Sequence, residues 1–436
     1  MDDKTAFPSP QILAGFTADP WESALPVLRF TGPAASAGMK VVRGNQGDQV
    51  WPEVVNKADV VVAPRDFPRF TEAYDRVVTL AHQRQIPVVY ETDDLLLDVP
   101  EEHVSRSVYS DHLIPLFRAV VEADVVTSST APLCDTLRLL NPNIRLLPNL
   151  LNDSLWSFRD AKAPEMQATP VVIGYMGGET HLPDLELVAP ALLRVLEKYG
   201  GKVILRFWGG KPPESLLGSA HVEWTALNDL NYTSFAAFFS RQECHIFIAP
   251  LQDSFFNRCK SAIKHLEYST HACPGVYSRI EPYLSVVEDG VNGLLAGSLE
   301  EWEGCISRLV DDPSLRRKMG ENALKTVQAN WLLSQRKDEW LQVYREAQEI
   351  ARHPRPERDA QLELFMRLLS QVEQRQNELV HTIIKVTDVL KESNARLSAM
   401  DAEIHALQNQ LDDIHNSRKW QLLTRIQKIQ EGITRR

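Results

Sequence analysis

Residues 249–278 read APLQDSFFNRCKSAIKHLEYSTHACPGVYS, and the rest of the chain is organised around them. The apolar run Cys244–Ala249 predicts a buried strand that ends in a Pro-Leu turn. After a polar loop, Lys260–Thr270 predicts a helix, and Pro274-Gly275 closes that helix before another strand begins. A strand, a loop, a helix and a second strand in this order indicate a parallel α/β unit.

The polar face of this helix carries residues suited to an anion. Lys260 and Lys264 are four residues apart and therefore share one side of a helix. Both lie near its start, where backbone N–H groups and the helix dipole favour negative charge. Glu267 follows one turn later, and its carboxylate can accept hydrogen bonds from ribose hydroxyls. These residues predict a nucleoside diphosphate site, although an ordinary solvated charged face explains the same pattern.

Length and composition limit the class of protein. A chain of 436 residues exceeds one ordinary domain and fits two or three. No apolar run reaches the roughly 18 residues of a membrane-spanning helix, and the N-terminus lacks a signal-peptide pattern. The net charge of −11 argues against general binding of nucleic acid.

The five cysteines are scattered along the chain without a C-x-x-C pair. Separated cysteines in an odd number indicate reduced thiols, so we expect a cytoplasmic location. The spacing of Cys259, His265, His271 and Cys273 fits no zinc pattern. We therefore expect no metal ion at these four residues.

Short apolar runs alternate with amphipathic helices over two long regions, which predicts two parallel sheets that are covered on both faces. In residues 1–150 the predicted strands are Ile12–Phe16, Ala58–Ala63, Ile86–Tyr90, Asp124–Ser128 and Ile144–Leu147, and the predicted helices are Phe67–Gln83, Ser110–Ala123 and Ala131–Leu140. After the polar segment Asn149–Gln167, residues 165–330 carry predicted strands at Val171–Tyr175, Val203–Trp208 and His245–Ala249 and predicted helices at Leu185–Tyr199, Tyr232–Ser240, Ser298–Asp311 and Pro313–Asn330. Residues 331–352 predict one further helix. Two such halves place the default ligand site in the cleft between them.

The turn after the first strand of the second half, Gly174–His181, contains three glycines. Gly177 and Gly178 allow a ligand to approach the backbone closely, and His181 and Asp184 lie near the start of the next helix, facing the cleft. A plain tight turn is the alternative explanation. In the first half, Tyr90–Leu95 ends a strand, so the carboxylates of Glu91, Asp93 and Asp94 point to the cleft. The two aspartates suggest a divalent cation, or one of them caps the next segment.

A heptad repeat begins at Leu362 and continues for eight heptads. One seam series is Leu362, Leu369, Gln376, Ile383, Leu390, Leu397, Ile404 and Leu411, and the other is Phe365, Val372, Leu379, Val386, Ser393, Met400, Leu407 and Ile414. Fourteen of these sixteen positions are apolar, which predicts a coiled coil over residues 357–416 and self-association through residues 362–414. Packing of the helix on its own protein is the alternative. The polar seam residues Gln376 and Ser393 can fix the register of the strands.

Residues 417–436 form a basic tail, because residues 418–436 carry six basic residues against one acidic residue. Trp420, Leu423 and Ile426 can share one face of a helix with basic residues elsewhere. This pattern is typical of a helix that lies on an anionic membrane surface. A frayed continuation of the coiled coil explains it equally well.

Several motifs resemble those of bacterial glycosyltransferases of the retaining, two-Rossmann (GT-B) class, in particular family 4-like enzymes of O-antigen and other surface-polysaccharide synthesis. They are Gly-Tyr-Met-Gly-Gly-x-x-His at 174–181, Phe-Asn-x-x-Lys-Ser-x-Ile-Lys-x-Leu-Glu-Tyr at 256–268, and Pro-Gly-Val-Tyr-Ser at 274–278. Such enzymes often end in a coiled coil and a Ser-x-x-Trp tail like Ser417–Trp420. The resemblance runs from about residue 58 to residue 350.

The resemblance implies a role for each part of the chain. The second half would bind a nucleotide-sugar, the first half a glycan or lipid-linked acceptor, and residues 331–352 would cross back to the first half. The implied catalytic residues are Lys264, Lys260 and His181, the donor-binding residues are Gly177, Gly178, Asn257, Ser261, Glu267 and Tyr268, and the acceptor-side residues are Glu91, Asp93 and Asp94. Glu267 matches the second glutamate of the Glu-x7-Glu motif, but Cys259 stands where the first belongs. The first glutamate of the motif is therefore missing, and Lys260 and Lys264 would take over part of its work.

The resemblance implies a retaining transfer that needs neither a metal nor a bound cofactor. The basic tail would hold this cytoplasmic protein at the inner face of the cell membrane. Two other functions fit the same residues, because a fold does not fix a function. The chain could be a non-catalytic coiled-coil scaffold whose site has decayed. It could also be an epimerase-like enzyme, which would change a nucleotide-sugar without an acceptor.

Overall fold

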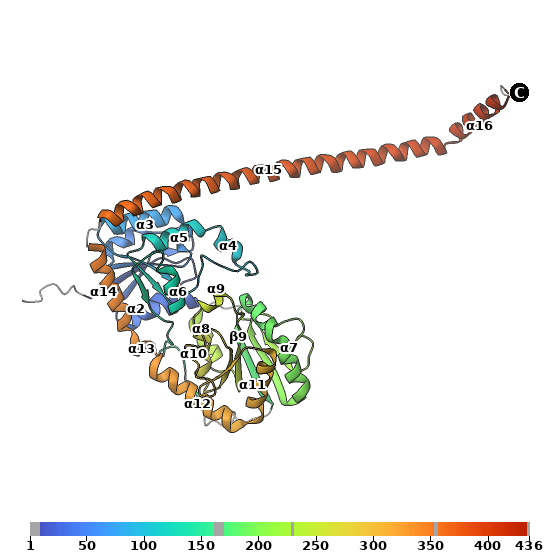
Figure 1. The fold of residues 1–436 in the computed structure, drawn as a ribbon. Helices are drawn as coiled ribbons and strands as arrows, with labels where there is room; N and C mark the ends of the chain where they lie inside the picture. Colours follow the sequence, from blue (N-terminus) through green and yellow to red (C-terminus); the bar gives the residue numbers. More distant parts are fainter. Residues whose placement is uncertain (1–8, 161–169, 228–230, 353–355, 434–436) are drawn as a thin grey trace, which may run out of the picture. The chain divides into compact units, whose positions relative to one another are not determined.

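The computed structural model describes residues 9–160, 170–227, 231–352 and 356–433. Its chain forms two units, Met1–Leu362 and Glu363–Arg436. The first unit contains two six-stranded sheets whose strands are all parallel, and helices cover both faces of each sheet (Figure 1). The predicted α/β fold of two Rossmann-like halves, followed by a long C-terminal helix, is confirmed.

The first sheet lies in residues 12–146. In spatial order its strands are β2 (Lys40–Arg43), β1 (Ile12–Gly15), β5 (Val60–Pro64), β6 (Val88–Thr92), β7 (Val125–Ser128) and β8 (Ile144–Leu146). Alternate side chains of each strand enter two separate cores, as a sheet covered on both faces requires. In β5, Val61 and Ala63 pack with helices α3 (Thr71–Gln83), α5 (Leu113–Glu122) and α6 (Ala131–Leu137). Val60 and Val62 face the other core.

The other face of the first sheet is covered by α2 (Gly32–Ser36) and α14 (Asp338–Arg352). Trp340 of α14 is 1% exposed, and its Nε1 atom donates a hydrogen bond to the backbone carbonyl of Arg29 over 3.0 Å. A segment that follows the second sheet in sequence therefore completes the core of the first half. The residues between Trp331 and α14 form a separate short helix, α13 (Leu333–Arg336).

The second sheet lies in residues 171–296. In spatial order its strands are β11 (Val222–Thr225), β10 (Val203–Gly209), β9 (Val171–Gly177), β12 (Ile246–Ala249), β13 (Gly275–Ser278) and β14 (Leu294–Ala296). Helices α7 (Leu182–Tyr199) and α11 (Leu299–Asp311) cover one face. Helices α8 (Tyr232–Phe239) and α10 (Ile263–Ser269) cover the other, and α12 (Pro313–Asn330) packs against α10 and α11.

The strand order reverses between β9 and β12, which are neighbours in the sheet. From this point the chain builds the sheet outward in both directions, so the loops after β9 and β12 run to opposite faces and leave a crevice at their carboxyl ends. The predicted glycine turn follows β9, and the stretch with the predicted lysines follows β12. The topology therefore brings these two segments to one place.

The helix predicted at Lys260–Thr270 is shorter than expected. Helix α9 (Phe255–Arg258) comes first, and α10 begins only at Ile263. The Ser254 hydroxyl caps α9, and the carbonyl of Cys259 turns away to accept a hydrogen bond from Thr130 Oγ1 over 2.7 Å. Lys260 therefore lies in the connection between two short helices, and it does not share a helical face with Lys264.

Three strands of the two six-stranded sheets were not predicted, β2, β11 and β14. Each has three or four residues and lies at an edge of its sheet. An edge strand has fewer buried neighbours, and β2 and β11 lack the continuous apolar run on which the predictions relied. The helix predicted at Ser110–Ala123 is α5, which begins at Leu113, and a separate short helix, α4 (Arg106–Ser110), precedes it.

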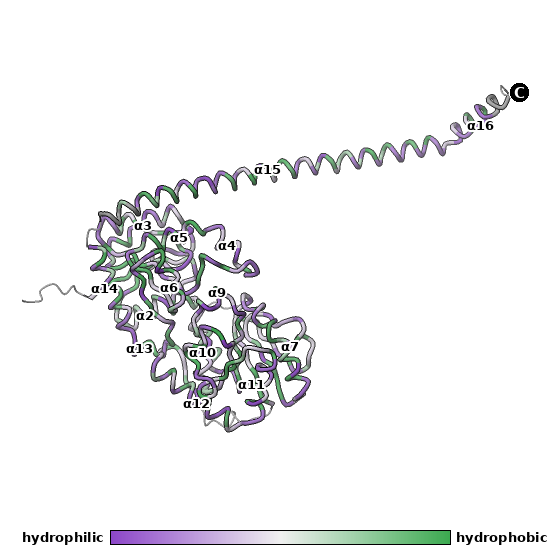
Figure 2. Tube along the Cα trace, in the orientation of Figure 1, coloured by the Kyte–Doolittle hydropathy of each residue, from purple (hydrophilic) through white to green (hydrophobic). Residues whose placement is uncertain are grey.

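The C-terminal region consists of α15 (Pro356–Asn416) and α16 (Arg418–Ile433). Hydrophobic residues recur along α15 between hydrophilic ones (Figure 2). None of the helices within the described ranges has the length and apolarity to cross a membrane. The last three residues of the predicted basic tail, 434–436, lie outside the described residues.

Candidate functional site

A pocket of about 480 Å³ lies between the two halves at the strand-order reversal. Gly177 and Gly178 line it from the turn after β9, and Lys264 and Glu267 line it from α10. We call it the Glu267 pocket. Other lining residues are Asp19, Ser23 and Leu25 from the first half and Trp208, Leu227 and Tyr232 from the second. The structure thus places four of the predicted site residues around one space.

The glycine turn presents open backbone to this pocket. Gly178 is exposed, and no heavy atom lies within 4 Å of the position that a Cβ would take there. Behind it, the N–H of Gly210 donates to the carbonyl of Gly177 over 2.7 Å. Gly209 has φ +97°, and a Cβ on it would lie 2.4 Å from that carbonyl oxygen. Only glycine fits at position 209, which lies behind the turn, whereas the open space at Gly178 leaves room for a ligand.

Tyr268 does not face the pocket, which corrects its expected role as a donor-binding residue. Its side chain is fully buried and stacks on Phe247 with the ring centroids 4.1 Å apart. Its hydroxyl accepts from the N–H of Met176 and donates to the carbonyl of Met176, each over 3.2 Å. Tyr268 therefore anchors the end of β9 directly before the glycine turn.

A series of two hydrogen bonds connects Asp184, His181 and Lys264. Asp184 Oδ2 lies 2.8 Å from His181 Nδ1, and His181 Nε2 lies 3.1 Å from Lys264 Nζ. An ammonium group can only donate, so His181 Nε2 is the acceptor and Nδ1 carries the proton that is donated to Asp184. Burial and the Lys264 charge lower the pKa of His181 to about 4, so the imidazole is neutral at physiological pH.

Asp184 connects both sides of the crevice. It lies in the first turn of α7, and its Oδ1 accepts from the backbone N–H of Gln252 over 2.8 Å and from Asn257 Nδ2 over 3.3 Å. Asn257 Nδ2 also donates to the carbonyl of Gln252 over 3.0 Å. Both protons of the Asn257 amide are therefore used within the chain, and this amide holds the loop after β12 in place.

Glu267 and Lys264 both titrate near neutral pH. Burial raises the pKa of Glu267 to about 7, against the opposing effects of its hydrogen bond from Tyr232 and of Lys264. Tyr232 donates that bond to Glu267 Oε1 over 2.8 Å. Burial and then the neighbouring charge of Lys260 lower the pKa of Lys264 to about 8. A bound anion would restore the charge on Lys264, because an opposite charge favours the ammonium form.

Lys260 lines a different pocket, of about 110 Å³, together with His103, His181, Asn257 and Phe256. We call it the His103 pocket. The Nζ atom of Lys260 lies 3.8 Å from Asp94 Oδ1 of the first half and 4.7 Å from the centre of the Phe256 ring. The two lysines that the sequence placed on one face therefore line separate pockets.

Ser261 and Cys259 both face away from the Glu267 pocket. Ser261 lines a third cavity, of about 180 Å³, and its hydroxyl accepts a hydrogen bond from Asn149 Nδ2 over 2.7 Å. The side chain of Cys259 is fully buried in the core of the first half. The thiol at the position of the missing glutamate therefore cannot reach a ligand in the Glu267 pocket.

The carboxylates predicted on the acceptor side are bound by arginines. Glu91 is 2% exposed and accepts from Arg29 Nε over 2.6 Å and from the Thr127 hydroxyl. Arg65 Nη1 lies 3.0 Å from Asp93 Oδ1 and 3.2 Å from Asp94 Oδ2. Neither aspartate caps a helix. Within the described ranges, no group of three or more histidine, cysteine or acidic residues is arranged to hold a metal ion.

The two aspartates have opposite pKa shifts. Burial raises the pKa of Asp93, whereas at Asp94 the charges of Lys260 and Arg65 outweigh burial and lower the pKa. Asp94 is therefore the negative partner of Lys260 where the two halves meet. Glu91, with both oxygens bonded in the core, has a structural position and does not open to the cleft.

Asp184 was expected beside His181 near the start of the helix, but its hydrogen bond to His181 was not predicted. Sequence reasoning missed three further residues that shape the site. Tyr232 and Asp19 gave no sequence signal, because they reach Glu267 and the pocket from elements distant in sequence. Arg65 stands directly after β5 with φ 46°, a conformation that is uncommon for a residue other than glycine.

Comparison with known families finds one match. Residues 191–342 match the family described as glycosyl transferase-like, which covers most of the second half together with α13 and part of α14. The search of curated proteins found no relative.

Solved structures share the two-sheet architecture at low sequence identity. Sucrose-phosphate synthase from Thermosynechococcus elongatus is 16% identical over 77% of this chain and 98% of its own, with a TM-score of 0.56. A glycosyltransferase from Rickettsia africae is 12% identical over 79% of this chain and 99% of its own, with a TM-score of 0.54. HepE from Anabaena, in complex with UDP and glucose, is 13% identical over 76% of this chain and 98% of its own, with a TM-score of 0.53. Identities this low establish the shared fold alone.

Proposed function

We propose that this protein is a glycosyltransferase that moves a sugar from a nucleotide-sugar donor to a glycan or lipid-linked glycan acceptor. One observation carries the proposal. Lys264 and Glu267, one helical turn apart, line the same pocket at the strand-order reversal between two Rossmann-like halves. A cation and a carboxylate in that arrangement match the diphosphate and the ribose of such a donor.

The pocket offers a distinct surface to each part of a nucleotide. Trp208, Leu227 and Phe235 form an apolar wall that suits the face of a nucleobase. Glu267 would accept hydrogen bonds from ribose hydroxyls through Oε2, because Tyr232 already donates to Oε1. The open backbone of Gly178 and the ammonium of Lys264 would hold the diphosphate.

Lys264 would act on the transition state. As the bond between sugar and diphosphate breaks, negative charge develops on the leaving diphosphate, and a buried ammonium stabilises it more strongly than water does. His181 accepts a hydrogen bond from Lys264, and Asp184 fixes the His181 tautomer. His181 would thereby position the catalytic lysine. The cations of the chain would stabilise this charge without a metal ion, and retention follows the resemblance to family 4-like enzymes.

The acceptor would approach from the first half. Asp94 and Lys260 meet across the two halves, and Lys260 lines the His103 pocket together with His181. Their partial burial would limit the access of water to the reacting sugar, which suppresses hydrolysis. We place this activity in bacterial surface-polysaccharide synthesis because of the motif resemblance.

Release of nucleoside diphosphate from a panel of nucleotide-sugars by the purified full chain tests the proposal. UDP-glucose comes first in the panel, because HepE was solved with UDP and glucose. We expect release from at least one donor and its loss, by roughly a hundredfold or more, in Lys264→Met. Lys325→Met is the matched control, because this lysine on α12 is 72% exposed.

The other outcomes separate the alternatives. A chain that no nucleoside diphosphate stabilises in a thermal-shift screen would be a scaffold. One observation favours the scaffold hypothesis, which is the burial of Cys259 away from the Glu267 pocket. Conversion of a nucleotide-sugar into its epimer without an acceptor would indicate an epimerase. Equal activity of Lys264→Met and the control would also contradict the proposed role of the pocket.

We further propose that the basic tail contacts anionic membranes. Helix α16 exposes Trp420, Leu423 and Ile426 beside its basic residues. Binding of the full chain to vesicles that contain anionic lipid should weaken in high salt. Replacing Arg418 and Lys419 with glutamine should also weaken vesicle binding, whereas the same replacement of Lys385 and Lys391 in α15 should not. Equal binding of both double variants would rule out a specific role of the tail.

A further inference from the structure

Helix α15 presents a continuous apolar seam without a partner in its own unit. Between Val372 and Ile414, eleven apolar seam side chains each keep 48–62% of their surface exposed. They are Val372, Leu379, Ile383, Val386, Leu390, Leu397, Met400, Ile404, Leu407, Leu411 and Ile414. A helix of 61 residues spans roughly 90 Å at 1.5 Å per residue, and exposed apolar surface of that extent marks an interaction site.

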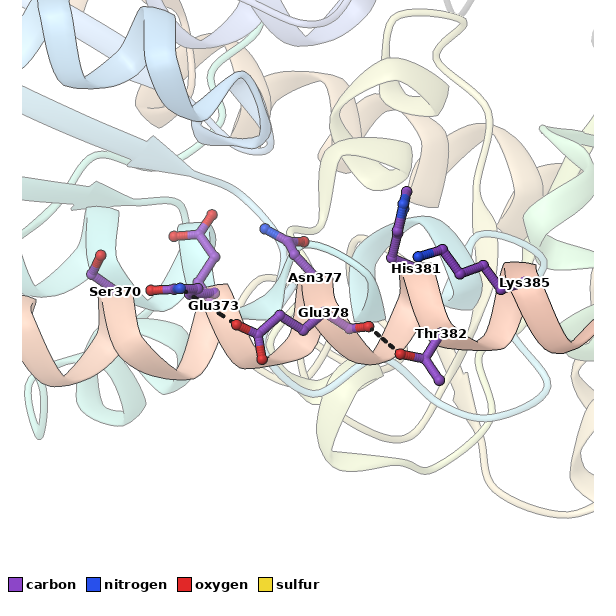
Figure 3. Close-up of a pocket in the computed structure, with 8 residues that line it drawn as sticks. Ser370, Glu373, Asn377, Glu378, His381, Thr382 and Lys385 are labelled. Carbon is purple, nitrogen blue, oxygen red and sulfur yellow. Dashed lines mark hydrogen bonds between the residues drawn. The ribbon is translucent and has the colours of Figure 1, made fainter.

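The remaining positions of the helix are polar. Figure 3 shows Ser370, Glu373, Asn377, Glu378, His381, Thr382 and Lys385, all from positions outside the seam. Several of these groups are bonded within the helix, since Arg375 Nη1 donates to Glu378 Oε2 over 2.8 Å and Thr382 Oγ1 donates to the carbonyl of Glu378 over 2.8 Å. A regular seam bordered by such positions is complementary to an identical seam on another helix.

We infer that α15 pairs with α15 of a second copy of this chain, in parallel and in register. The polar seam residues limit the possible alignments, because a buried polar side chain without a polar partner is costly. In a parallel, in-register pair, Gln376 meets Gln376 of the partner and Ser393 meets its own counterpart. A shift by one heptad would instead place Gln376 against Leu369 or Ile383.

One antiparallel alignment also satisfies the polar residues, because Gln376 and Ser393 can face each other twice around a centre between residues 384 and 385. This alignment leaves Leu411 and Ile414 without apolar partners. The charges beside the seam also disfavour it. In the antiparallel pair, Arg396 lies next to Arg375 of the partner on both sides, and like charges repel.

In the parallel pair, Arg396 lies next to Asp401 of the partner, which is the favourable pairing across a parallel seam. This contact also forms twice. Arg396 and Asp401 are both exposed, and neither makes an ion pair within the part of the chain that the structure describes. The seam, the polar residues and the flanking charges therefore agree on one arrangement. This inference does not depend on the proposed enzymatic function.

Sedimentation equilibrium of the full chain tests the pairing, and charge reversal tests its direction. We expect a mass of two or more chains. Arg396→Glu should weaken association by roughly tenfold, because it replaces two attractive contacts with two repulsive ones. Adding Asp401→Arg to that variant should restore association. Arg375→Glu should change little, because in the parallel pair it faces Val380 of the partner.

The antiparallel arrangement predicts a different effect of these substitutions on the strength of association. Antiparallel helices would associate more tightly in both Arg396→Glu and Arg375→Glu, since either change removes the contact between arginines. A spin label on Asn409→Cys, in a chain whose partly exposed Cys305 is replaced by serine, gives an independent measurement. Parallel helices place the two labels roughly 20–30 Å apart, whereas the antiparallel alignment places them roughly 70 Å apart. A monomer at micromolar concentration, tighter association of Arg396→Glu or the long label distance would each overturn the inference.

Discussion

His181 Nε2 lies 3.1 Å from Lys264 Nζ, while Asp184 holds the other ring nitrogen of His181 at 2.8 Å. This contact orients Lys264 and still leaves it on the wall of the Glu267 pocket. Because the lysine is buried, its pKa is lowered to about 8. Its charge, and with it the proposed binding of a diphosphate, therefore depends on pH in the range of ordinary assays.

We expect the affinity for a nucleoside diphosphate to fall as the pH rises through about 8. The ammonium form of Lys264 predominates below that pKa and is lost above it, and the bound anion favours the charged form. Calorimetric titrations at pH 7 and pH 9 measure the change, and proton uptake on binding near pH 8 would identify its source. In Lys264→Met the decrease through pH 8 should be absent, and any dependence that remains should disappear when Glu267→Gln is added, because the pKa of Glu267 is raised to about 7. A decrease of equal size in Lys264→Met would assign it to another group.

Asp184→Asn combined with Lys264→Met should release the tautomer of His181. Asp184 accepts from Nδ1 and Lys264 donates to Nε2, so either partner alone keeps the proton on Nδ1. Long-range proton–nitrogen NMR spectra of the imidazole report the tautomer directly and do not require activity. We expect a single Nδ1–H form in the wild-type chain and in Asp184→Asn, and a mixture in the double variant. A pure Nε2–H form in the wild-type chain would contradict the assigned hydrogen bonds.

Asp184→Asn should also lower stability by about 1–3 kcal/mol, because the bonds that a buried carboxylate accepts from Gln252 and Asn257 become weaker. Asp253→Asn in the same loop is the matched control, since Asp253 pairs with Arg258 at the surface. Its melting temperature should stay close to that of the wild-type chain. An equal loss of stability in the two variants would show that the negative charge of the loop stabilises the chain, and not the hydrogen bonds that Asp184 accepts.

Glu267→Gln should remove discrimination between ribose and deoxyribose. The wild-type chain is expected to bind a nucleoside diphosphate roughly tenfold more tightly than its 2′-deoxy form, which is the typical value of one charge-assisted hydrogen bond. The variant should bind both forms with similar, weaker affinity. If the difference between the two ligands survived in Glu267→Gln, the ribose would not lie against this carboxylate.

Two glycines in neighbouring turns should behave differently. Gly178→Val should leave the melting temperature nearly unchanged, because open space surrounds the position of its Cβ, but it should block the ligand. Gly209→Ala should destabilise the chain by about 1–3 kcal/mol, because this residue has φ +97° and a Cβ would press on the Gly177 carbonyl. Thermal melting and nucleotide titration together separate the two effects. Unimpaired binding by Gly178→Val would place the ligand elsewhere.

The buried pair of Arg29 and Glu91 should be sensitive to which partner is removed. Glu91→Gln leaves a guanidinium that cannot lose its charge and should cost about 3–5 kcal/mol. Arg29→Met leaves a carboxyl group whose pKa burial already raises, so it can take up a proton and should cost less. Urea denaturation at two pH values measures both. The cost of Arg29→Met should rise with pH, since more work is then needed to keep Glu91 protonated.

Some site residues were recognisable from the sequence because they lie in local patterns. Lys264 and Glu267 are one turn apart on a helix, and Gly177 and Gly178 follow an apolar strand, so their common location follows from parallel α/β topology. Tyr268 and Ser261 were assigned from the motif resemblance, and their side chains turn to the core and to another cavity. The direction of a side chain depends on its neighbours in space, which a motif does not specify.

The sequence by itself determined the two alternating α/β halves and the heptad seam, because the periods of apolar residues are local properties of the chain. Only the tertiary structure decided how the chemistry is distributed. The backbone of Cys259 is held by Thr130, which is 129 residues away in sequence. That long-range contact accompanies the break between α9 and α10, which buries Cys259 and separates Lys260 from Lys264.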